Sequence, residues 1–428
     1  MSSKKKVLII TYYWPPAGGS GVQRWLKFVK YLRDFNIEPV IYTVDNPSYP
    51  ILDKSLESEI PKGLEILKQP IFEPNSILSF FGNKKKKESA GFLNPNPTFF
   101  GKIVQYIRAN YFIPDARKFW IKPSIKFLSN YLKNNKIDAI ITTGPPHSMH
   151  KIGLALKEKF AIKWISDFRD PWTEIDYFKQ LPLTKKAKKK HHQLEQEVLE
   201  KSDMVIVVGE TMRKKFYKHN HNIDVLTNGF DSYENSLTKE LDSNFSITHV
   251  GLMNADRNPA ILWEVLHEIS NQNIDFKNDL SIKLIGKIDE TVIQDIQVFN
   301  PKNIVRIPYL EHEEVRKYQE SSQVLLLSIN QVPSAKGIIT GKIFEYLQAK
   351  RPILCIGPED GDAAAILKKT NAGIIVDFDH KNKLKATILK LYKDFKEEKL
   401  VVKSINIEQY HRKNITSQLA EVIKKVVS

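Results

Sequence analysis

A glycine, a lysine and a glutamate lie close together at Gly341, Lys342 and Glu345, where a helical pattern begins. The first N–H groups of a helix and the helix dipole favour an anion, and glycine lets the backbone come close to it. Lys342 adds a full positive charge there. Glu345 follows one turn later, where its carboxylate could accept hydrogen bonds from ribose hydroxyls. The set suits a nucleoside diphosphate, although an ordinary surface helix could carry the same residues, and local physics alone favours that simpler interpretation.

A second group of candidates follows two predicted strands in the first half of the chain. Pro-Pro-His-Ser, which contains His147, comes after the strand 137–144. Asp-Phe-Arg-Asp-Pro-Trp, which contains Arg169 and Asp170, comes after the strand 163–166. The carboxyl ends of parallel strands meet at one edge of a sheet, where open α/β sheets bind ligands. A single histidine would be interpreted as a core residue, whereas this cluster favours a site.

A glycine-rich loop follows the first predicted strand, 7–10. Gly18, Gly19 and Gly21 come after two adjacent prolines and before a helical pattern. Glycine permits positive φ angles and close approach of a ligand to the backbone. The prolines and the glycine spacing do not fit the dinucleotide-binding fingerprint. Alone, the loop indicates only a strand–loop–helix unit of a parallel sheet.

The composition bounds the kind of protein that positions these residues. The chain has 428 residues, 42% of them hydrophobic and 27% charged, which is globular and long enough for two domains. The single cysteine, Cys355, excludes an internal disulfide and fits a reducing cytoplasm. The apolar run 7–10 is too short for a signal peptide, and no run approaches the length of a membrane-spanning helix. We expect a cytoplasmic protein.

The net charge of +16 predicts attraction to an anionic surface such as nucleic acid, phospholipid or a phosphorylated substrate. Two basic runs stand out, 84–87 and 185–192, and a solvated surface would explain them equally well. Nucleic acid is the weaker alternative, because the sequence has no zinc-finger spacing, no RNA-binding signature and no recognisable helix-turn-helix pattern.

Strands alternate with helices in both halves of the chain, which predicts two doubly wound parallel sheets. We expect a first domain over 1–235, with an irregular insertion at 46–100, and a second domain over 245–405. The boundary between them is expected in the polar stretch 232–244. The predicted strands are 7–10, 39–44, 137–144, 163–166, 203–208, 245–251, 282–285, 304–307, 324–328, 353–356 and 372–376.

Several motifs resemble those of retaining glycosyltransferases with the GT-B fold, in the large family numbered four. The resemblance extends from Val7 to about Val376, and two of its motifs look like a subgroup that builds bacterial surface polysaccharides. In the family a Glu, seven residues and a second Glu form the donor motif. Glu345 matches the second Glu, which holds the ribose, whereas Gly337 stands where the first is expected. The motifs are Lys-Ile-Phe-Glu-Tyr-Leu (342–347), the His147 and Arg169 motifs given above, and Asn-Gly-Phe-Asp (228–231).

The resemblance implies transfer of a sugar from a nucleotide-sugar to an acceptor hydroxyl with retained anomeric configuration. It implies two Rossmann-like domains that face a central cleft, and a last helix, 406–428, that crosses back to the first domain. His147 is expected near the donor sugar, whereas Arg169 and Asp170 are expected to shape the acceptor pocket. The expected donor-binding residues are Gly18, Gly19, Arg257, Thr340, Gly341, Lys342 and Glu345.

The resemblance also implies the partners of the reaction. The leaving diphosphate would be neutralised by helix amides, Arg257 and Lys342, so no metal and no cofactor are expected. The acceptor would be a glycan or a polyprenyl-diphosphate-linked saccharide, and the protein would lie in the cytoplasm, peripheral on the inner face of the cell membrane. Nucleic acid is not an expected partner.

Three alternatives remain open. A sugar-nucleotide epimerase shares the fold, but it would be expected to have extra carboxylates in the second domain. A non-catalytic GT-B scaffold subunit would be expected to lose residues such as His147, Arg257 and Glu345, which are all present. A basic nucleic-acid-binding protein would explain the charge but not the motifs at the strand ends.

Overall fold

The computed structural model describes residues 4–73, 99–231, 240–299 and 301–428. The chain divides into two compact units, one formed by Met1–Thr227 with Arg412–Ser428 and one by Asn228–His411. We call these unit 1 and unit 2 and describe each by itself. The division comes just before the stretch 232–244, in which the sequence analysis places the domain boundary.

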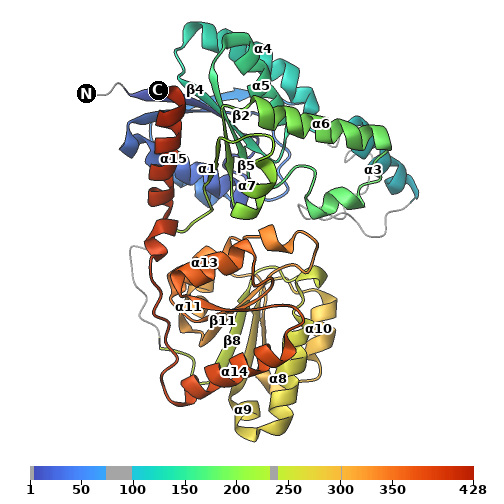
Figure 1. Cartoon of the computed structure of the whole chain (residues 1–428), viewed down its shortest axis with the longest axis vertical. Helices are drawn as coiled ribbons and strands as arrows, with labels where there is room; N and C mark the ends of the chain where they lie inside the picture. Colours follow the sequence, from blue (N-terminus) through green and yellow to red (C-terminus); the bar gives the residue numbers. More distant parts are fainter. Residues whose placement is uncertain (1–3, 74–98, 232–239, 300) are drawn as a thin grey trace. The chain divides into compact units, whose positions relative to one another are not determined.

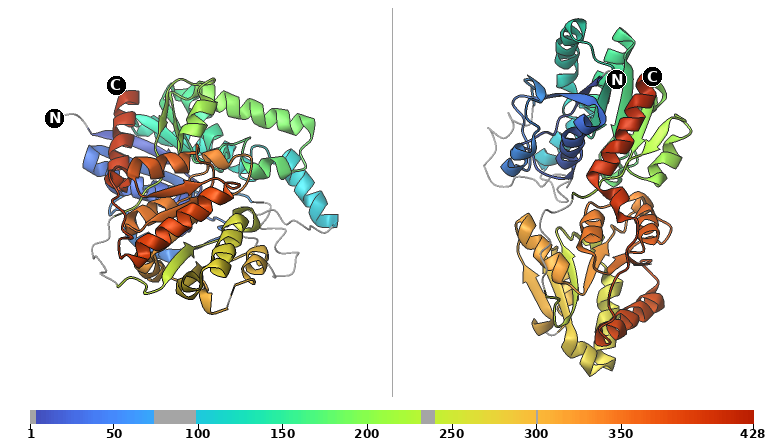
Figure 2. Two further views of the ribbon diagram at one scale, coloured as in Figure 1. Left: turned by 60° about the horizontal axis from the view of Figure 1, so that its bottom comes forward. Right: turned by 90° about the vertical axis from the view of Figure 1, so that its left-hand side faces the viewer.

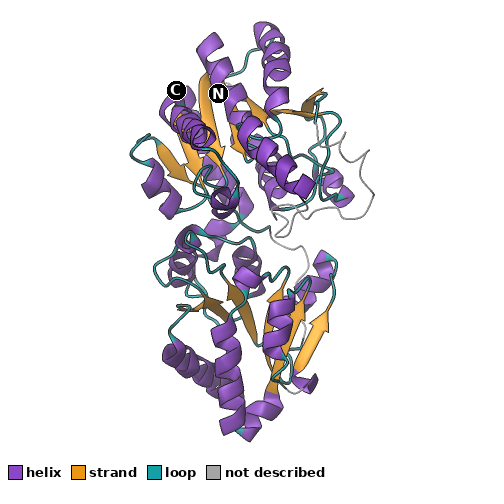
Figure 3. Cartoon of the chain, turned by 90° about the vertical axis from the view of Figure 1, so that its right-hand side faces the viewer, coloured by secondary structure: helices purple, strands orange, loops and turns teal. Residues whose placement is uncertain are grey.

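Unit 1 is built on a parallel sheet whose seven strands, within the described residues, follow the order β3-β2-β1-β4-β5-β6-β7. Helices lie on both faces of this sheet (Figure 3). The strands are β1 (Lys5–Ile10), β2 (Ile37–Val44), β3 (Glu65–Gln69), β4 (Ala139–Gly144), β5 (Lys163–Phe168), β6 (Met204–Val207) and β7 (Ile223–Val225). The helices are α1 (Ser20–Leu32), α3 (Phe99–Tyr111), α4 (Lys118–Asn134), α5 (Ser148–Phe160), α6 (Lys185–Lys201), α7 (Glu210–Phe216) and α15 (Arg412–Val427).

The central strands are continuous apolar runs because both faces of the sheet are covered. Successive side chains of a strand point to opposite faces. Val7 and Ile9 of β1 therefore pack in the core under α1 and α15, whereas Leu8 and Ile10 pack in the core under α4, α5 and α6. This double burial fixes where β1 ends and thus where the glycine-rich loop begins.

The last helix, α15, belongs to unit 1 and lies beside α1 (Figures 1 and 2). Its apolar face, with Ile415, Leu419 and Ile423, is buried in the core that also contains β1. Arg412 donates a hydrogen bond of 3.0 Å to the side chain of Gln23 on α1. The preceding turn, Ile407–Tyr410, instead lies in unit 2, so the expected helix over 406–428 is divided between the two units.

The prediction of an irregular insertion at 46–100 needs correction for part of that range. Glu65–Gln69 is a regular edge strand, which pairs in parallel with β2, and Ile71 beyond it is buried. This strand was not predicted because Glu-Ile-Leu-Lys-Gln has only two apolar residues. An edge strand needs no more, since it pairs with a single neighbouring strand. Residues 74–98, which include the basic run 84–87, lie outside the described part of the chain.

Unit 2 holds a parallel sheet whose six strands, counted over the described residues, follow the order β10-β9-β8-β11-β12-β13. The strands are β8 (Phe245–Val250), β9 (Leu280–Ile285), β10 (Ile304–Ile307), β11 (Val324–Ser328), β12 (Ile353–Ile356) and β13 (Gly373–Val376). The helices are α8 (Ala260–Gln272), α9 (Ile274–Asp279), α10 (Glu290–Ile296), α11 (His312–Ser321), α12 (Lys342–Ala349), α13 (Asp362–Thr370) and α14 (Lys381–Lys396).

Both sheets have the strand order of the doubly wound Rossmann type, to which unit 1 adds β7 at one edge. The predicted fold class, two Rossmann-like parallel-sheet domains, is confirmed. In the part of the chain that the structure describes, no helix has both the length and the apolar character needed to cross a membrane.

Candidate active site

Each sheet has one point where the strand order reverses, and the candidate residues lie at these points. In unit 1, β1 has β2 on one side and β4 on the other, and in unit 2, β8 lies between β9 and β11. Loops that leave neighbouring strands in opposite directions open a crevice at the carboxyl edge of such a sheet, which is where ligands bind. The loops that follow β1 and β4 therefore form a candidate site in unit 1, and those that follow β8 and β11 form a candidate site in unit 2.

The glycine-rich loop after β1 uses its first two glycines differently. A Cβ at Gly18 would lie 2.9 Å from Cγ2 of Ile51, and the N–H of Gly18 donates to the carbonyl of Ile51 at 3.0 Å, so Gly18 packs against its own chain. Gly19, which comes just before α1, has a φ of +98°, and a Cβ there would meet nothing within 4 Å. Gly19 is thus the position with both a need for glycine and room for a ligand.

Gly21 makes space for Arg169. A Cβ at Gly21 would lie only 1.8 Å from Nη1 of Arg169, so any larger residue would displace the guanidinium. Arg169 reaches this place from the end of β5, where its Nη2 donates to the carbonyl of Pro145 and its backbone N–H donates to Gly144 at 3.0 Å. One arginine therefore joins the start of α1 to the segments at the ends of β4 and β5.

His147 lies at the start of α5 and is buried. Its ring stacks on Trp172, with ring centroids 4.6 Å apart and planes 2° from parallel. Burial, with a smaller contribution from His150, lowers the pKa of His147 well below its usual value, so the imidazole is neutral near pH 7. Its buried Nδ1 has no hydrogen-bond partner among the described residues. The ring therefore offers a neutral polar atom rather than a positive charge.

The two aspartates of the motif at the end of β5 have different environments. Asp167 is fully buried, and its carboxylate accepts hydrogen bonds from Arg24 at 2.9 Å, Trp25 at 2.8 Å and Thr143 at 2.8 Å. These donors and the charge of Arg24 hold the pKa of Asp167 below its usual value despite burial. Asp167 is thus a structural anion that fixes α1 to the sheet, whereas the side chain of Asp170 is exposed at the same edge.

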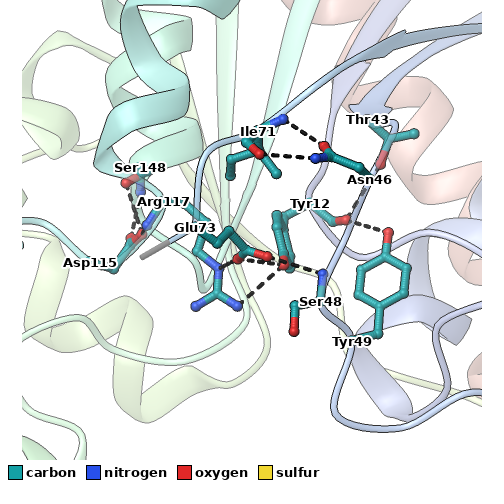
Figure 4. A network of polar contacts seen from close by, with 10 residues as sticks. All are labelled: Tyr12, Thr43, Asn46, Ser48, Tyr49, Ile71, Glu73, Asp115, Arg117 and Ser148. Carbon is teal, nitrogen blue, oxygen red and sulfur yellow. Dashed lines mark hydrogen bonds and ion pairs between the residues drawn. The ribbon is translucent and has the colours of Figure 1, made fainter. Parts of the chain in front are cut away.

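A polar network supports this edge from beside the end of β1 (Figure 4). The hydroxyl of Tyr12 donates to Glu73 at 2.8 Å, and Nε of Arg117 lies 3.2 Å from the same carboxylate oxygen. Arg117 also lies over the ring of Tyr12, 4.5 Å from its centroid. Asp115, two residues before Arg117, accepts from both the backbone N–H and the hydroxyl of Ser148, each at 2.8 Å. The network thereby fixes the start of α5 immediately after His147.

In unit 2, Lys342 begins α12 and its side chain reaches back under the loop after β8. Its Nζ lies 3.0 Å from Nε2 of His249 and 3.2 Å from the carbonyl of Leu252. Gly251 permits this path, because it has a φ of +94° and a Cβ there would lie 2.8 Å from Cε of Lys342.

The surroundings of His249 fix its tautomer. Its Nδ1 lies 3.2 Å from the carbonyl oxygen of Leu326, which can only accept a hydrogen bond, so Nδ1 carries the proton. Nε2 then accepts from the ammonium of Lys342. Burial, with a further contribution from the charge of Arg257, lowers the pKa of Lys342 to about 7.

Arg257 is the second cation at this edge. Its Nε and Nη2 donate to the side-chain oxygen of Asn330 at 2.9 and 2.7 Å, and its Nη1 donates to the carbonyl of Leu252 at 3.1 Å. Within the described residues, the side chains of Arg257 and Lys342 donate hydrogen bonds to neutral groups. Two partly desolvated cations that share the carbonyl of Leu252 are an arrangement that would favour an anion.

The remaining predicted donor residues lie along the start of α12. Glu345 is half-buried and accepts a hydrogen bond from Gln319 at 3.1 Å, which orients its carboxylate. Thr340 has a buried hydroxyl with no hydrogen-bond partner in the described part of the chain. Gly341 is exposed with a φ of −57°, and a Cβ there would meet nothing within 4 Å. Its backbone does not require glycine, so any role of Gly341 would come from the open space above it.

Three residues that position the site were not predicted. His249 and Asn330 hold Lys342 and Arg257, and Trp172 supports His147. His249 had a weak signal, since it is the titratable residue of the predicted strand 245–251. Asn330 had no signal of its own, whereas Trp172 stands in the Asp-Phe-Arg-Asp-Pro-Trp motif but was not predicted as a site residue. Across the described residues, no group of three or more His, Cys, Asp or Glu side chains is placed to hold a metal ion.

Comparison with known proteins gives a likeness of structure and not of sequence. No family model matches this sequence, and no curated protein matches it. Solved structures do match over nearly the whole chain. One is HepE from Anabaena in complex with UDP-glucose, with a TM-score of 0.60 and 11% identity over 98% of this chain and 99% of that one.

Two further structures have the same architecture. WaaG, a glycosyltransferase involved in lipopolysaccharide biosynthesis, matches with a TM-score of 0.51 and 12% identity over 98% of each chain. A putative UDP-N-acetylglucosamine 2-epimerase from Listeria monocytogenes matches with a TM-score of 0.56 and 12% identity, over 99% of this chain and 96% of that one. At these identities the likeness establishes the fold, and the chain has the predicted GT-B fold.

Proposed function

We propose that this protein is a glycosyltransferase that moves a sugar from a nucleotide-sugar to an acceptor hydroxyl. The observation that carries the proposal is the pair of cations at the switch point of unit 2. Arg257 and Lys342 lie beside the first turn of α12, their hydrogen-bond partners are neutral, and Glu345 follows one turn along the same helix. A nucleoside diphosphate needs positive charge for its phosphates and a carboxylate for its ribose, and this edge supplies both.

The proposed roles follow from the charges. In glycosyl transfer negative charge develops on the departing diphosphate, and cations fixed beforehand at that position lower the barrier. Arg257 and protonated Lys342 would supply this stabilisation, so we propose a reaction without a metal. The carboxylate of Glu345 would bind the ribose hydroxyls. In unit 1, the neutral ring of His147 would contact the donor sugar, and Arg169 and Asp170 would bind the acceptor.

Finer features of the proposal rest on the motifs. The resemblance to family four supports retention of configuration and a role in bacterial surface polysaccharides, with a glycan or a polyprenyl-diphosphate-linked saccharide as acceptor. Such an acceptor would place the enzyme in the cytoplasm at the inner face of the membrane. UDP-sugars are the first donors to test, because HepE was solved with UDP-glucose.

Donor binding tests the proposal directly. Calorimetry and thermal shift with UDP, GDP, CMP and their common sugars should show micromolar binding of one nucleotide, in buffer that contains EDTA. Replacing the carboxylate in Glu345→Ala should weaken it at least about tenfold, since a hydrogen bond to a charged group contributes about 1.5–3 kcal/mol. Glu313→Ala, which removes an exposed carboxylate of α11, is the matched control and should leave binding unchanged. Absence of any nucleotide binding would contradict the proposal and favour a scaffold role.

An epimerase is the second candidate, because the Listeria structure shares the fold over nearly the whole chain. The products distinguish the two reactions. A transferase releases the nucleoside diphosphate only when an acceptor is present, whereas a 2-epimerase converts UDP-N-acetylglucosamine without one. Gly337 stands where the family has its first motif glutamate. The absence of this carboxylate disfavours an epimerase, which would be expected to have extra carboxylates in the second domain.

A further inference from the structure

Helix α3 of unit 1 has a row of exposed apolar residues. Phe99, Ile103, Ile107 and Tyr111 are spaced four residues apart and therefore form one stripe, and all four are exposed, Phe99 by 82% and Tyr111 by 66%. A surface helix of a globular domain normally turns such a stripe toward the core. Ala109, which is not part of this stripe, is buried. The helix thus has an apolar face that its own fold does not use.

A basic segment is joined to this helix. The side-chain oxygen of Asn110 accepts from the N–H of Thr184 at 2.7 Å, and its amide donates to the carbonyl of Pro182 at 2.8 Å. Thr184 is the N-cap of α6, whose first turns carry the exposed residues Lys185, Lys186, Lys188 and Lys189. In Figures 1 and 2, α3 and the start of α6 lie side by side at the margin of unit 1.

These charges are not neutralised locally. None of the four lysines forms an ion pair with a carboxylate of the described residues, and α3 itself contains no acidic residue. An exposed apolar stripe beside a group of cations is the pattern of a helix that lies in the interface of a membrane. Lysines in such a position attract anionic headgroups, and their long aliphatic stems can lie along the apolar layer.

We propose that the exposed face of α3 and the first turns of α6 dock on an anionic phospholipid bilayer, with α3 in the plane of the interface. The positive charge of the lysines on α6 favours an anionic bilayer over other partners. A second copy of the chain would bring two lysine groups together, and a nucleic acid would leave the stripe of Phe, Ile and Tyr in water. The proposal identifies the surface by which the enzyme proposed above would reach a lipid-linked acceptor, but the docking itself does not depend on that activity.

Sedimentation with vesicles tests the proposal with the full-length protein. We expect binding to vesicles of phosphatidylcholine with phosphatidylglycerol, little binding to phosphatidylcholine alone, and release at high salt. Ile103→Gln with Ile107→Gln should abolish most of the binding, because it removes the centre of the stripe. Lys186→Gln with Lys189→Gln should lower the partition coefficient at least about fivefold, the effect expected of even one cation near the surface.

Matched controls come from unit 2. Leu389→Gln replaces an exposed apolar residue, and Lys369→Gln with Lys390→Gln replaces two exposed lysines, so both should bind vesicles as the native protein does. Equal binding by native protein and the Ile103/Ile107 variant would overturn the proposal, as would equal affinity for neutral and anionic vesicles. Binding to duplex DNA that survives the Ile103/Ile107 change, without vesicle binding, would overturn it in favour of nucleic acid. Donor calorimetry on the same variants separates this result from any failure of the proposed reaction.

Discussion

Donor affinity should fall as the pH rises through 7, because Lys342 changes its charge there. The ammonium is buried close to Arg257, and these two causes lower its pKa to about 7. Below this pH the side chain is protonated and opposes the charge of a diphosphate. Above it the amine is neutral, and of this pair Arg257 alone keeps its positive charge. His249 does not contribute to the change, since burial keeps its pKa well below its usual value.

The size of the effect follows from the protonated fraction of Lys342. With a pKa of about 7, that fraction is about 0.9 at about pH 6 and about 0.1 at about pH 8. If only the protonated form binds, affinity falls about tenfold over this range, which corresponds to about 1.4 kcal/mol. A nucleotide-sugar keeps both phosphate charges throughout the range, so the change would belong to the protein.

Isothermal titration calorimetry with a UDP-sugar, at constant ionic strength across this pH range, measures the effect. Lys342→Arg should bind with little dependence on pH, because a guanidinium stays protonated. Lys342→Met should bind weakly at every pH. A native affinity that stays constant from about pH 6 to about pH 8 would refute the reasoning, because it would show that Lys342 keeps one charge state through the titration predicted for it.

Two substitutions in unit 1 distinguish a residue that positions the side chain of Arg169 from one that stabilises the fold. Gly21→Ala should lower glycosyl transfer while the melting temperature stays the same or rises slightly, since alanine favours the helix but its Cβ must displace the guanidinium of Arg169; a full rate with a native pH profile would contradict this. Asp167→Asn should instead lower the free energy of unfolding by about 3–5 kcal/mol, because it breaks the buried ion pair with Arg24. Urea denaturation measures that loss, and a change below about 1 kcal/mol would contradict the structural role given to Asp167.

The elements that the sequence reveals are those whose burial is nearly complete. Val7 to Ile10 is a continuous apolar run because helices cover both faces of β1. β3 and β7 were not predicted, because an edge strand and a strand of three residues have too few apolar positions to form a pattern. Secondary structure was therefore predictable where packing requires one kind of side chain, and not where it permits several.

The sequence indicates the charged members of the candidate site, and it does not indicate the residues that hold them. Lys342 carries a charge next to a helix start, which a local pattern can indicate. Its partner His249 is 93 residues away in sequence, and the contact exists only because β8 and α12 meet at the switch point. Gly21 and Arg169 are likewise far apart in sequence and come into contact only in the folded unit. Sequence patterns indicate which residues can do chemistry, whereas their supports depend on tertiary packing.

Unit 1 is interrupted in sequence by the whole of unit 2, and this affects the order in which the chain can fold during synthesis. Domains generally fold as units as they leave the ribosome, the N-terminal one first. Here the apolar face of α1 meets α15 only after residues 412–428 have been made. The contiguous segment Asn228–His411 is complete earlier. The unit that begins first is therefore finished last, and until then a nascent chain exposes the apolar side chains that α15 will cover.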